Sequence, residues 1–114
     1  MQRFRRRVNV MAGFVVIDFE TYSPVVLNNT SVSIYARYPA TKLWCAGWAY
    51  NNEPPQIWLP GDPAPEAIRT ASTFVAHNAG FEFNLWRYKL TPLYGWPEVP
   101  SFHRWFCTMA GVQS

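Results

Sequence analysis

Acidic residues are scarce in this chain of 114 residues, which has only seven Asp and Glu against ten Lys and Arg. Cysteine is rarer still, and two cysteines exclude a disulfide framework and a zinc site. Each is expected to be a small buried residue in a reducing cytoplasm. Apolar runs stay well short of the ~18 residues that a membrane span requires. These shortages predict a cytoplasmic protein without a membrane segment, whose basic surface suits a phosphate-rich partner.

Apolar residues, by contrast, make up 49% of the chain and aromatic residues 18%, which excludes disorder for most of it. The length allows one domain with a real core, expected over residues 14–114. Residues 1–13 are interpreted as a basic N-terminal extension, since residues 1–7 hold four of the ten basic residues. Three explanations stay open: an extension upstream of a true start near Met11, which we favour, a basic arm touching nucleic acid, or the start of a targeting peptide.

Two carboxylates follow a short apolar run near the start of the proposed domain. Residues 14–17 (Phe-Val-Val-Ile) predict a buried strand, and Asp18 and Glu20 come at its carboxyl end. Strand side chains alternate, so both acids project from the same face. They repel each other unless a cation lies between them, and oxygen ligands of this kind suit Mg²⁺ or Mn²⁺. The alternative interpretation is that they merely begin a polar loop.

A second strand-to-helix junction brings a third acid. Residues 74–76 predict a short strand, Asn78 is a favourable helix cap, and Phe81, Leu85 and Tyr88 would form one apolar stripe of the helix that follows. Glu82 falls in the first turn, off that stripe. Its simplest interpretation is a surface acid that interacts with the helix dipole, for about 1 kcal/mol or less.

Together the two segments resemble the first two motifs of the DEDD superfamily of 3′–5′ exonucleases, in particular the proofreading domain of family A DNA polymerases and its phage-encoded branch. Asp18-x-Glu20 matches the family's Asp-x-Glu, and Asn78-x-x-x-Glu82 matches its Asn-x-x-x-Asp with Glu in place of Asp. The resemblance covers roughly residues 14 to 110. It implies an RNase H-like fold and two-metal hydrolysis of a DNA 3′ end.

The same resemblance implies roles for individual residues. Asp18, Glu20 and Glu82 would be the catalytic residues and the ligands of Mg²⁺ or Mn²⁺. Residues beside them are expected to bind the 3′ end of single-stranded DNA, since aromatic rings accept the face of any base. These substrate-binding candidates are Phe19, Thr21, Asn78 and Phe81.

The third motif of the family, Tyr or His followed four residues later by Asp, is not found in this sequence. Tyr94 is followed by Glu98 in a Gly/Pro-rich stretch unsuited to a helix, and His103 is followed by Cys107. Residues 105–110 instead resemble the strand-to-helix junction that precedes the third motif. We therefore expect a C-terminally truncated domain, inactive in this form. The alternative is a non-catalytic prophage remnant that binds metal or nucleic acid weakly, so whether the chain is an enzyme stays open.

Without its C-terminal helices, such a domain would leave aromatic surface uncovered. The candidates are Trp86, Trp96, Trp105 and Phe106, and exposed apolar surface of this kind would favour self-association. The rest of the chain predicts an α/β arrangement with an antiparallel strand pair joined to a parallel strand. Its expected elements are a helical turn at 33–38, strands at 43–50 and 55–59, and a helix beginning at 65–69.

Overall fold

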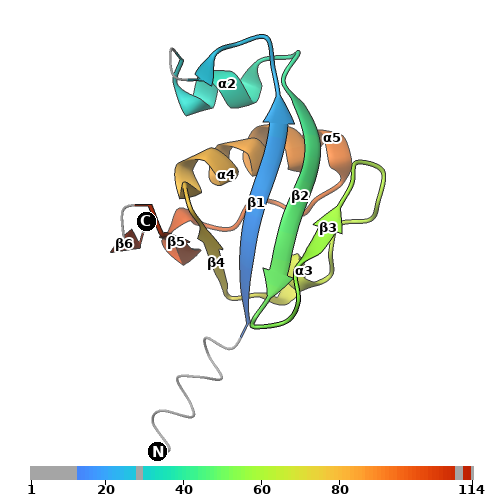
Figure 1. The fold of residues 1–114 in the computed structure, drawn as a ribbon, viewed down its shortest axis with the longest axis vertical. Helices are drawn as coiled ribbons and strands as arrows, with labels where there is room; N and C mark the ends of the chain where they lie inside the picture. The colour runs from blue at the N-terminus through green and yellow to red at the C-terminus, as the bar shows by residue number, and fades with distance from the viewer. Residues whose placement is uncertain (1–12, 28–29, 110–111, 114) are drawn as a thin grey trace, which may run out of the picture.

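The computed structural model describes residues 13–27, 30–109 and 112–113. Over these residues the chain has a mixed α/β fold built on one six-stranded sheet (Figure 1), with the strand order β3-β2-β1-β4-β5-β6. The helices α3, α4 and α5 lie behind the sheet in this view, so β1 and β2 present their other face to solvent. The expected α/β class is confirmed.

The sheet combines an antiparallel half with a parallel half. The long central strand β1 pairs antiparallel with β2, and β2 pairs antiparallel with β3. On its other edge β1 pairs parallel with β4, and β4 pairs parallel with β5. The short strand β6 runs antiparallel to β5. The strands are β1 (Phe14–Tyr22), β2 (Lys42–Tyr50), β3 (Gln56–Trp58), β4 (Thr73–Ala76), β5 (Trp105–Cys107) and β6 (Val112–Gln113).

The helical segments are short. They are α2 (Val32–Arg37), α3 (Ala67–Thr70), α4 (Ala79–Leu85), a π-helical turn η2 (Trp86–Leu90), α5 (Thr91–Tyr94) and a 3₁₀ turn η3 (Phe102–Arg104). The segments α4, η2 and α5 follow one another without a break, and Gly95, with a φ of 77°, ends the run in the left-handed conformation that glycine adopts readily. No helix among the described residues is long and apolar enough to cross a membrane.

Two expected boundaries differ from the structure. The first strand does not stop at Ile17 but continues to Tyr22, because β2 pairs with it along its whole length, up to Tyr22 opposite Lys42. At the other end, β5 forms as expected, but the described residues after it pair back as β6 rather than beginning a helix. Hydrogen bonds to a neighbouring strand decided both outcomes, and the local sequence does not encode them.

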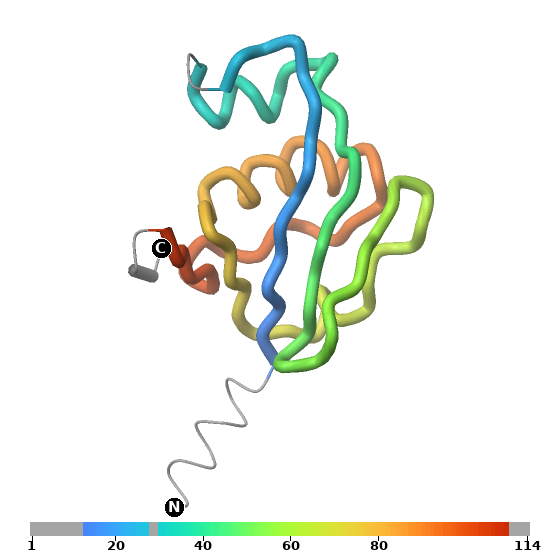
Figure 2. Tube along the Cα trace, in the orientation of Figure 1, coloured from blue at the N-terminus to red at the C-terminus, as the bar shows by residue number. Residues whose placement is uncertain are grey.

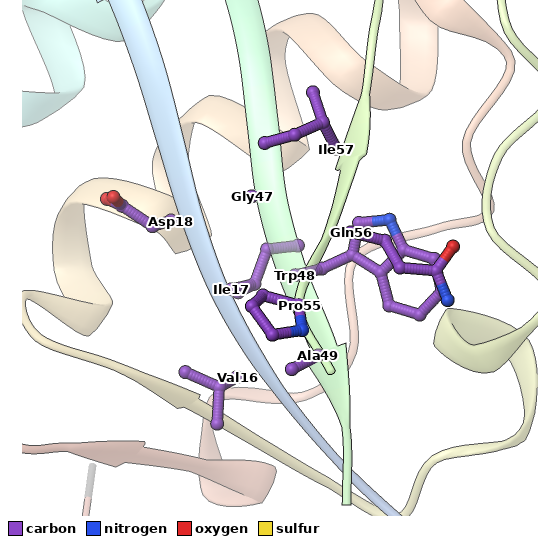
Figure 3. A pocket seen from close by; sticks show the side chains of 9 residues that line it. All are labelled: Val16, Ile17, Asp18, Gly47, Trp48, Ala49, Pro55, Gln56 and Ile57. Carbon is purple, nitrogen blue, oxygen red and sulfur yellow. The ribbon is translucent and has the colours of Figure 1, made fainter. Parts of the chain in front are cut away.

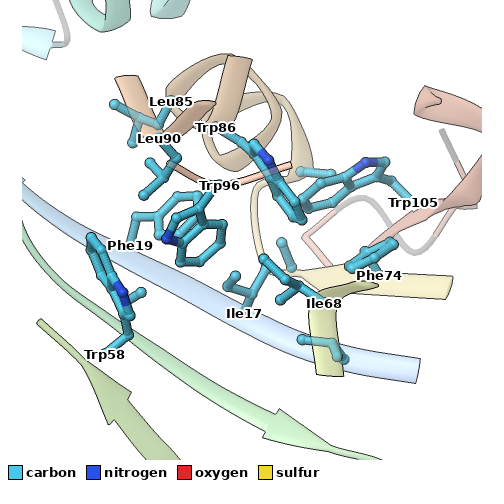
Figure 4. Packing of buried hydrophobic residues seen from close by; sticks show 14 of the residues in the cluster. Ile17, Phe19, Trp58, Ile68, Phe74, Leu85, Trp86, Leu90, Trp96 and Trp105 are labelled. Carbon is cyan, nitrogen blue, oxygen red and sulfur yellow. The ribbon is translucent and has the colours of Figure 1, made fainter. Parts of the chain in front are cut away.

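The core is dominated by tryptophan. Trp58, Trp86, Trp96 and Trp105 pack against Ile17, Phe19 and Phe74 between the sheet and the helices (Figure 4). Successive indoles meet nearly edge to face, with centroids 5.2 Å apart for Trp58 and Trp96, 5.1 Å for Trp96 and Trp86, and 5.9 Å for Trp86 and Trp105. Such pairs contribute about 0.5–1.5 kcal/mol each beyond the area they bury.

The Gly/Pro-rich segment 95–101 closes this core. It returns behind the sheet from α5 to β5 (Figure 2), and its carbonyl groups satisfy two of the buried indoles. Trp86 donates to the Pro97 carbonyl at 2.8 Å and Trp105 to the Pro100 carbonyl at 3.3 Å. The prediction that Trp86, Trp96 and Trp105 form an exposed aromatic surface is therefore wrong: they are 0, 2 and 0% exposed. Among the four candidates, only Phe106 is on the surface.

Candidate functional site

Asp18 and Glu20 lie side by side on the open face of the sheet. Within β1, Val15, Ile17 and Phe19 are buried in the core, whereas Asp18 and Glu20 alternate with them and are exposed. The interpretation of the two acids as the start of a polar loop is therefore wrong, because both are paired strand residues opposite β2. A regular strand holds the pair in place, as the predicted cation site requires.

Glu82 reaches the same stretch of β1 from the edge of the strand. The ladder between β1 and β4 ends at Val16 opposite Val75, so the β1 backbone has no β4 partner beyond that point. The first turn of α4 lies there, and the Glu82 Oε2 accepts a hydrogen bond from the Phe19 N–H at 3.2 Å. Glu82 is only 4% exposed, so the interpretation of this residue as a surface acid is wrong.

The three carboxyl groups influence one another electrostatically. Burial raises the pKa of Glu82 to about 8; the hydrogen bond from Phe19 N–H opposes this shift, and the charges of Asp18 and, more weakly, Glu20 add to it. The pKa of Glu20 is also raised, first by burial and then by the charge of Asp18 and a hydrogen bond with it. Three acids from β1 and α4 therefore share one region, and a cation bound there would favour the charged forms of Glu20 and Glu82, whose pKa values are raised in its absence.

The fit of this region to a divalent cation is incomplete in the conformation observed. Carboxylate oxygens are suitable donors for Mg²⁺ or Mn²⁺, and the mutual repulsion of the acids is what such an ion would relieve. However, residues 13–27 and 30–109 contain no group of three or more His, Cys, Asp or Glu side chains arranged to hold a metal ion. Glu82 is committed to the Phe19 N–H instead. The donor chemistry fits, and Asp18 and Glu20 are the acids exposed to an incoming ion.

The other predicted site residues have structural roles. Phe19 is 2% exposed and packs edge-on against Trp96, so it is a core residue and offers no surface to a base. The Thr21 hydroxyl lies 2.8 Å from the Tyr35 hydroxyl and ties β1 to α2. Phe81 packs against the ring of Tyr35 with centroids 6.0 Å apart. Thr21 and Phe81 thereby place α2 beside the acids.

Asn78 is the residue that precedes α4, as the sequence predicts, but its side chain makes no capping hydrogen bond. It is partly buried. The start of α4 is instead held by backbone bonds from the Phe81 and Glu82 N–H groups to the Asn78 carbonyl, at 2.9 and 3.3 Å. Asn78 thus contributes to the position of Glu82 through its main chain.

A shallow depression lies on the open face beside Asp18 (Figure 3). Its volume is about 190 Å³ and it is lined almost entirely by apolar atoms, with Val16, Ala49, Pro55 and Ile57 among its lining residues. Asp18 projects from β1 on the side away from β2 and β3. Asp18 is therefore bordered by apolar surface.

A feature that the sequence did not reveal is a β-bulge next to Glu20. The register of β1 and β2 shifts there: Glu20 lies opposite Cys45, but Thr21 lies opposite Leu43, and Trp44 is the extra residue of β2. Trp44 is 66% exposed. The tryptophan was not among the predicted site residues, because the position of a bulge depends on strand pairing rather than on composition.

Comparisons with protein-family models, with curated proteins and with solved structures found no match to this chain.

Proposed function

We propose that this chain carries part of the catalytic site of a 3′–5′ exonuclease with an RNase H-like fold, of the kind found in the proofreading domains of phage-type family A DNA polymerases. The observation that carries the proposal is the convergence of Asp18, Glu20 and Glu82, three of only seven acids, on one stretch of β1. The sheet supports it, since an antiparallel strand set continued by parallel strands is compatible with an RNase H-like fold. The partner would be a single-stranded DNA 3′ end in the cytoplasm.

In this proposal Asp18 and Glu20 hold Mg²⁺ or Mn²⁺ at the open face, and Glu82 supports the site from the strand edge. A cation bound there would supply charge stabilisation to a phosphodiester and activate water for attack on it. The chain's own residues keep the two exposed acids on one face of a paired strand and hold α4 against the edge of that strand. The acids would thereby be preorganised, and this is the main protein contribution to such chemistry.

A non-catalytic protein that binds nucleic acid or metal weakly is the second candidate. It is favoured by the absence of a three-ligand group among residues 13–27 and 30–109. The sequence also contains no Tyr or His followed four residues later by Asp. Since each missing preorganised group costs about two to three orders of magnitude in rate, we expect residues 1–114 alone to give no detectable turnover.

The test that separates the two candidates starts with metal binding. Mn²⁺ binding, followed by electron paramagnetic resonance of the free ion, should be saturable and should weaken at least about tenfold in Asp18→Asn, because one of the two exposed ligands becomes neutral. Glu53→Gln is the control, since Glu53 is an exposed acid in the turn after β2. Equal Mn²⁺ affinity of the parent and Asp18→Asn would refute the proposed site.

A second measurement concerns the reaction. A labelled single-stranded DNA is incubated with Mn²⁺ and either this chain or a chain joined to a segment with the Tyr-x-x-x-Asp motif. Trimming that EDTA stops and Asp18→Ala abolishes would support the exonuclease. Strong trimming by residues 1–114 alone would show that the third motif is dispensable, against our expectation.

A further inference from the structure

Trp44 is held on the open face of the sheet by the bulge in β2. Leu43 and Ala46 are both buried in the core, although they are three positions apart. In a regular strand, residues three positions apart point to opposite faces, so the bulge is what allows both to point inward. The bulge leaves Trp44 without a partner in the register, between Leu43, which lies opposite Thr21, and Cys45, which lies opposite Glu20. Bulges commonly re-aim a side chain next to a functional site. Here the result is a largely exposed indole beside one of the proposed metal ligands.

The surface around Trp44 has an aromatic and basic character. Tyr22 lies opposite Lys42 in the register, and both are exposed, as is Trp44 two residues beyond Lys42. Tyr22 is two residues beyond Glu20, so the alternation of β1 places it on the same face as that acid. The end of the sheet next to the acids therefore presents two large rings and an ammonium group.

Beyond Lys42 the positive charge continues onto α2 and η2. The guanidinium groups of Arg37 and Arg87 lie 5.7 and 5.2 Å from the centre of the same ring, that of Tyr88. The Lys89 ammonium donates to the Tyr38 carbonyl at 2.7 Å. Burial lowers the pKa of Lys89, and the charge of Lys42 adds to this shift.

This cluster contains most of the positive charge of the described chain. Six Lys and Arg fall within residues 13–27 and 30–109, and four of them are Arg37, Lys42, Arg87 and Lys89. Lys89 is only 4% exposed, whereas Arg37, Lys42 and Arg87 are on the surface, so a polyanion laid across this region would contact those three cations. We name these four residues the basic cluster.

We propose that Trp44 is the stacking platform for a base near the 3′ end of single-stranded DNA, whose upstream phosphates run over Lys42 toward the basic cluster. The inference rests on the proposed function, because it places the 3′ end at Asp18 and Glu20. The polarity follows from the layout: acids with a cation hold the terminal phosphodiester, Trp44 stacks on a neighbouring base, and the cations take the phosphates beyond it. Stacking on a single ring accepts any base, so sequence preference is weak.

The platform also accounts for the role that Phe19 cannot fill. A base needs an accessible ring face, and Phe19 is enclosed in the core while Trp44 is the most exposed tryptophan of the chain. An exposed Trp attracts other partners too, in particular a second copy of this chain. The cations beside it favour a nucleic acid, since they would repel the same cluster on a second copy.

The experiment measures binding of a short fluorescein-labelled oligo-dT by anisotropy, in EDTA so that no hydrolysis intervenes. We expect Trp44→Ala to weaken binding about tenfold or more, and Trp44→Phe to stay within about threefold of the parent, because a phenyl ring still stacks. Phe106→Ala is the matched control. Phe106 is an exposed aromatic residue on β5, where it pairs with Val75 of β4 in the parallel half of the sheet, away from β2. It should bind like the parent. Circular dichroism confirms that the variants fold.

Three outcomes would overturn the inference: no binding of oligo-dT by the parent, equal affinity of Trp44→Ala and the parent, or equal losses in Trp44→Ala and Phe106→Ala. Sedimentation of the same variants tests whether Trp44 binds a second copy of the chain instead. A loss of self-association in Trp44→Ala without a loss of DNA binding would assign Trp44 to a protein interface. The proposed function is tested separately, by Mn²⁺ binding. If oligo-dT binding depends on Trp44 but Mn²⁺ binding does not depend on Asp18, the platform stands without the exonuclease.

Discussion

At the scale of single residues, Glu82 differs from the other acids of the described residues, which are all exposed. It is a buried acid whose carboxyl group takes the place of a strand carbonyl, accepting the Phe19 N–H where β4 has ended. The sequence placed it correctly in the first turn of a helix, and of its two interpretations, a metal ligand and a surface acid, the structure rules out the second. Burial was not predictable, because it depends on the point at which β4 stops pairing with β1.

Glu82 should make the stability of the metal-free protein depend on pH. Its pKa is about 8 in the folded state, above the usual 4.5, so the folded state binds more protons than the unfolded state between these values. This contribution is fully present below about pH 4.5 and is lost as the pH rises to about 8. We expect Glu82→Gln to be more stable than the parent by on the order of 5 kcal/mol at about pH 9, and nearly equal at about pH 4.

Urea denaturation in EDTA at several pH values measures this difference. Glu53→Gln serves as the control and should follow the parent at every pH, since Glu53 is exposed. A parallel pH dependence of the parent and Glu82→Gln would mean that the Glu82 carboxyl titrates as an ordinary surface acid.

At the scale of elements, the position of α2 depends on a few specific contacts. This six-residue helix is too short to be stable alone. It is tied to β1 by the hydroxyl groups of Thr21 and Tyr35, and to η2 by the bond from Lys89 to the Tyr38 carbonyl. The Lys89 bond satisfies a carbonyl at the C-terminal end of α2, where a positive charge is favourable. The helix therefore depends on side chains distant in sequence.

Removal of the ammonium group should loosen α2. We expect Lys89→Met to keep the packing of the aliphatic stem but to cost about 1–3 kcal/mol, because the Tyr38 carbonyl loses a charged donor. Backbone amides of Val32–Arg37 should then exchange with solvent faster than those of α4. Arg69→Met, at an exposed position in α3, is the control and should change stability by less than about 0.5 kcal/mol. Unchanged exchange in α2 would show that Thr21 and Tyr35 suffice to hold it.

The elements themselves were largely predictable. The helical turn before Pro39, the hairpin of β2 and β3 around Asn51, and the strand before Asn78 all formed close to their expected bounds. Their signals are local: alternating or continuous apolar runs, turn residues and a capping residue. The bulge at Trp44 and the extension of β1 to Tyr22 were missed, because both are properties of strand pairing. The sequence therefore predicted the acids of the candidate site but not the exposed ring of Trp44 beside them.

At the scale of the whole molecule, charge is unevenly distributed. The basic cluster is at the α2 end, and four further arginines lie in residues 1–7, outside the described residues. Both groups are positively charged and would attract DNA. Removal of residues 1–12 should weaken DNA binding only if the N-terminal arginines contact the phosphates. The mixed fold itself was expected from the order of elements, whereas this clustering depends on the tertiary structure.

The salt dependence of oligo-dT binding separates the two groups. If the basic cluster contacts the phosphates, the slope of log K against log salt should be about −0.7 for each phosphate neutralised, and thus about −2 to −3 in total. The slope should persist when residues 1–12 are removed and should fall by roughly 0.7 to 1.4 in Arg37→Gln with Arg87→Gln. A slope that vanishes with residues 1–12 would assign DNA binding to the N-terminal arginines.

The row of indoles in the core has an optical consequence. Trp58, Trp96, Trp86 and Trp105 are close neighbours at fixed and nearly perpendicular angles, so their electronic transitions couple and excitation passes readily from ring to ring. The folded protein should therefore show an intense near-ultraviolet circular dichroism signal that disappears when the rings separate. Because all four rings are buried, the signal reports the assembly of the core and is insensitive to events on the open face. The four indoles therefore provide an intrinsic optical probe of the native core.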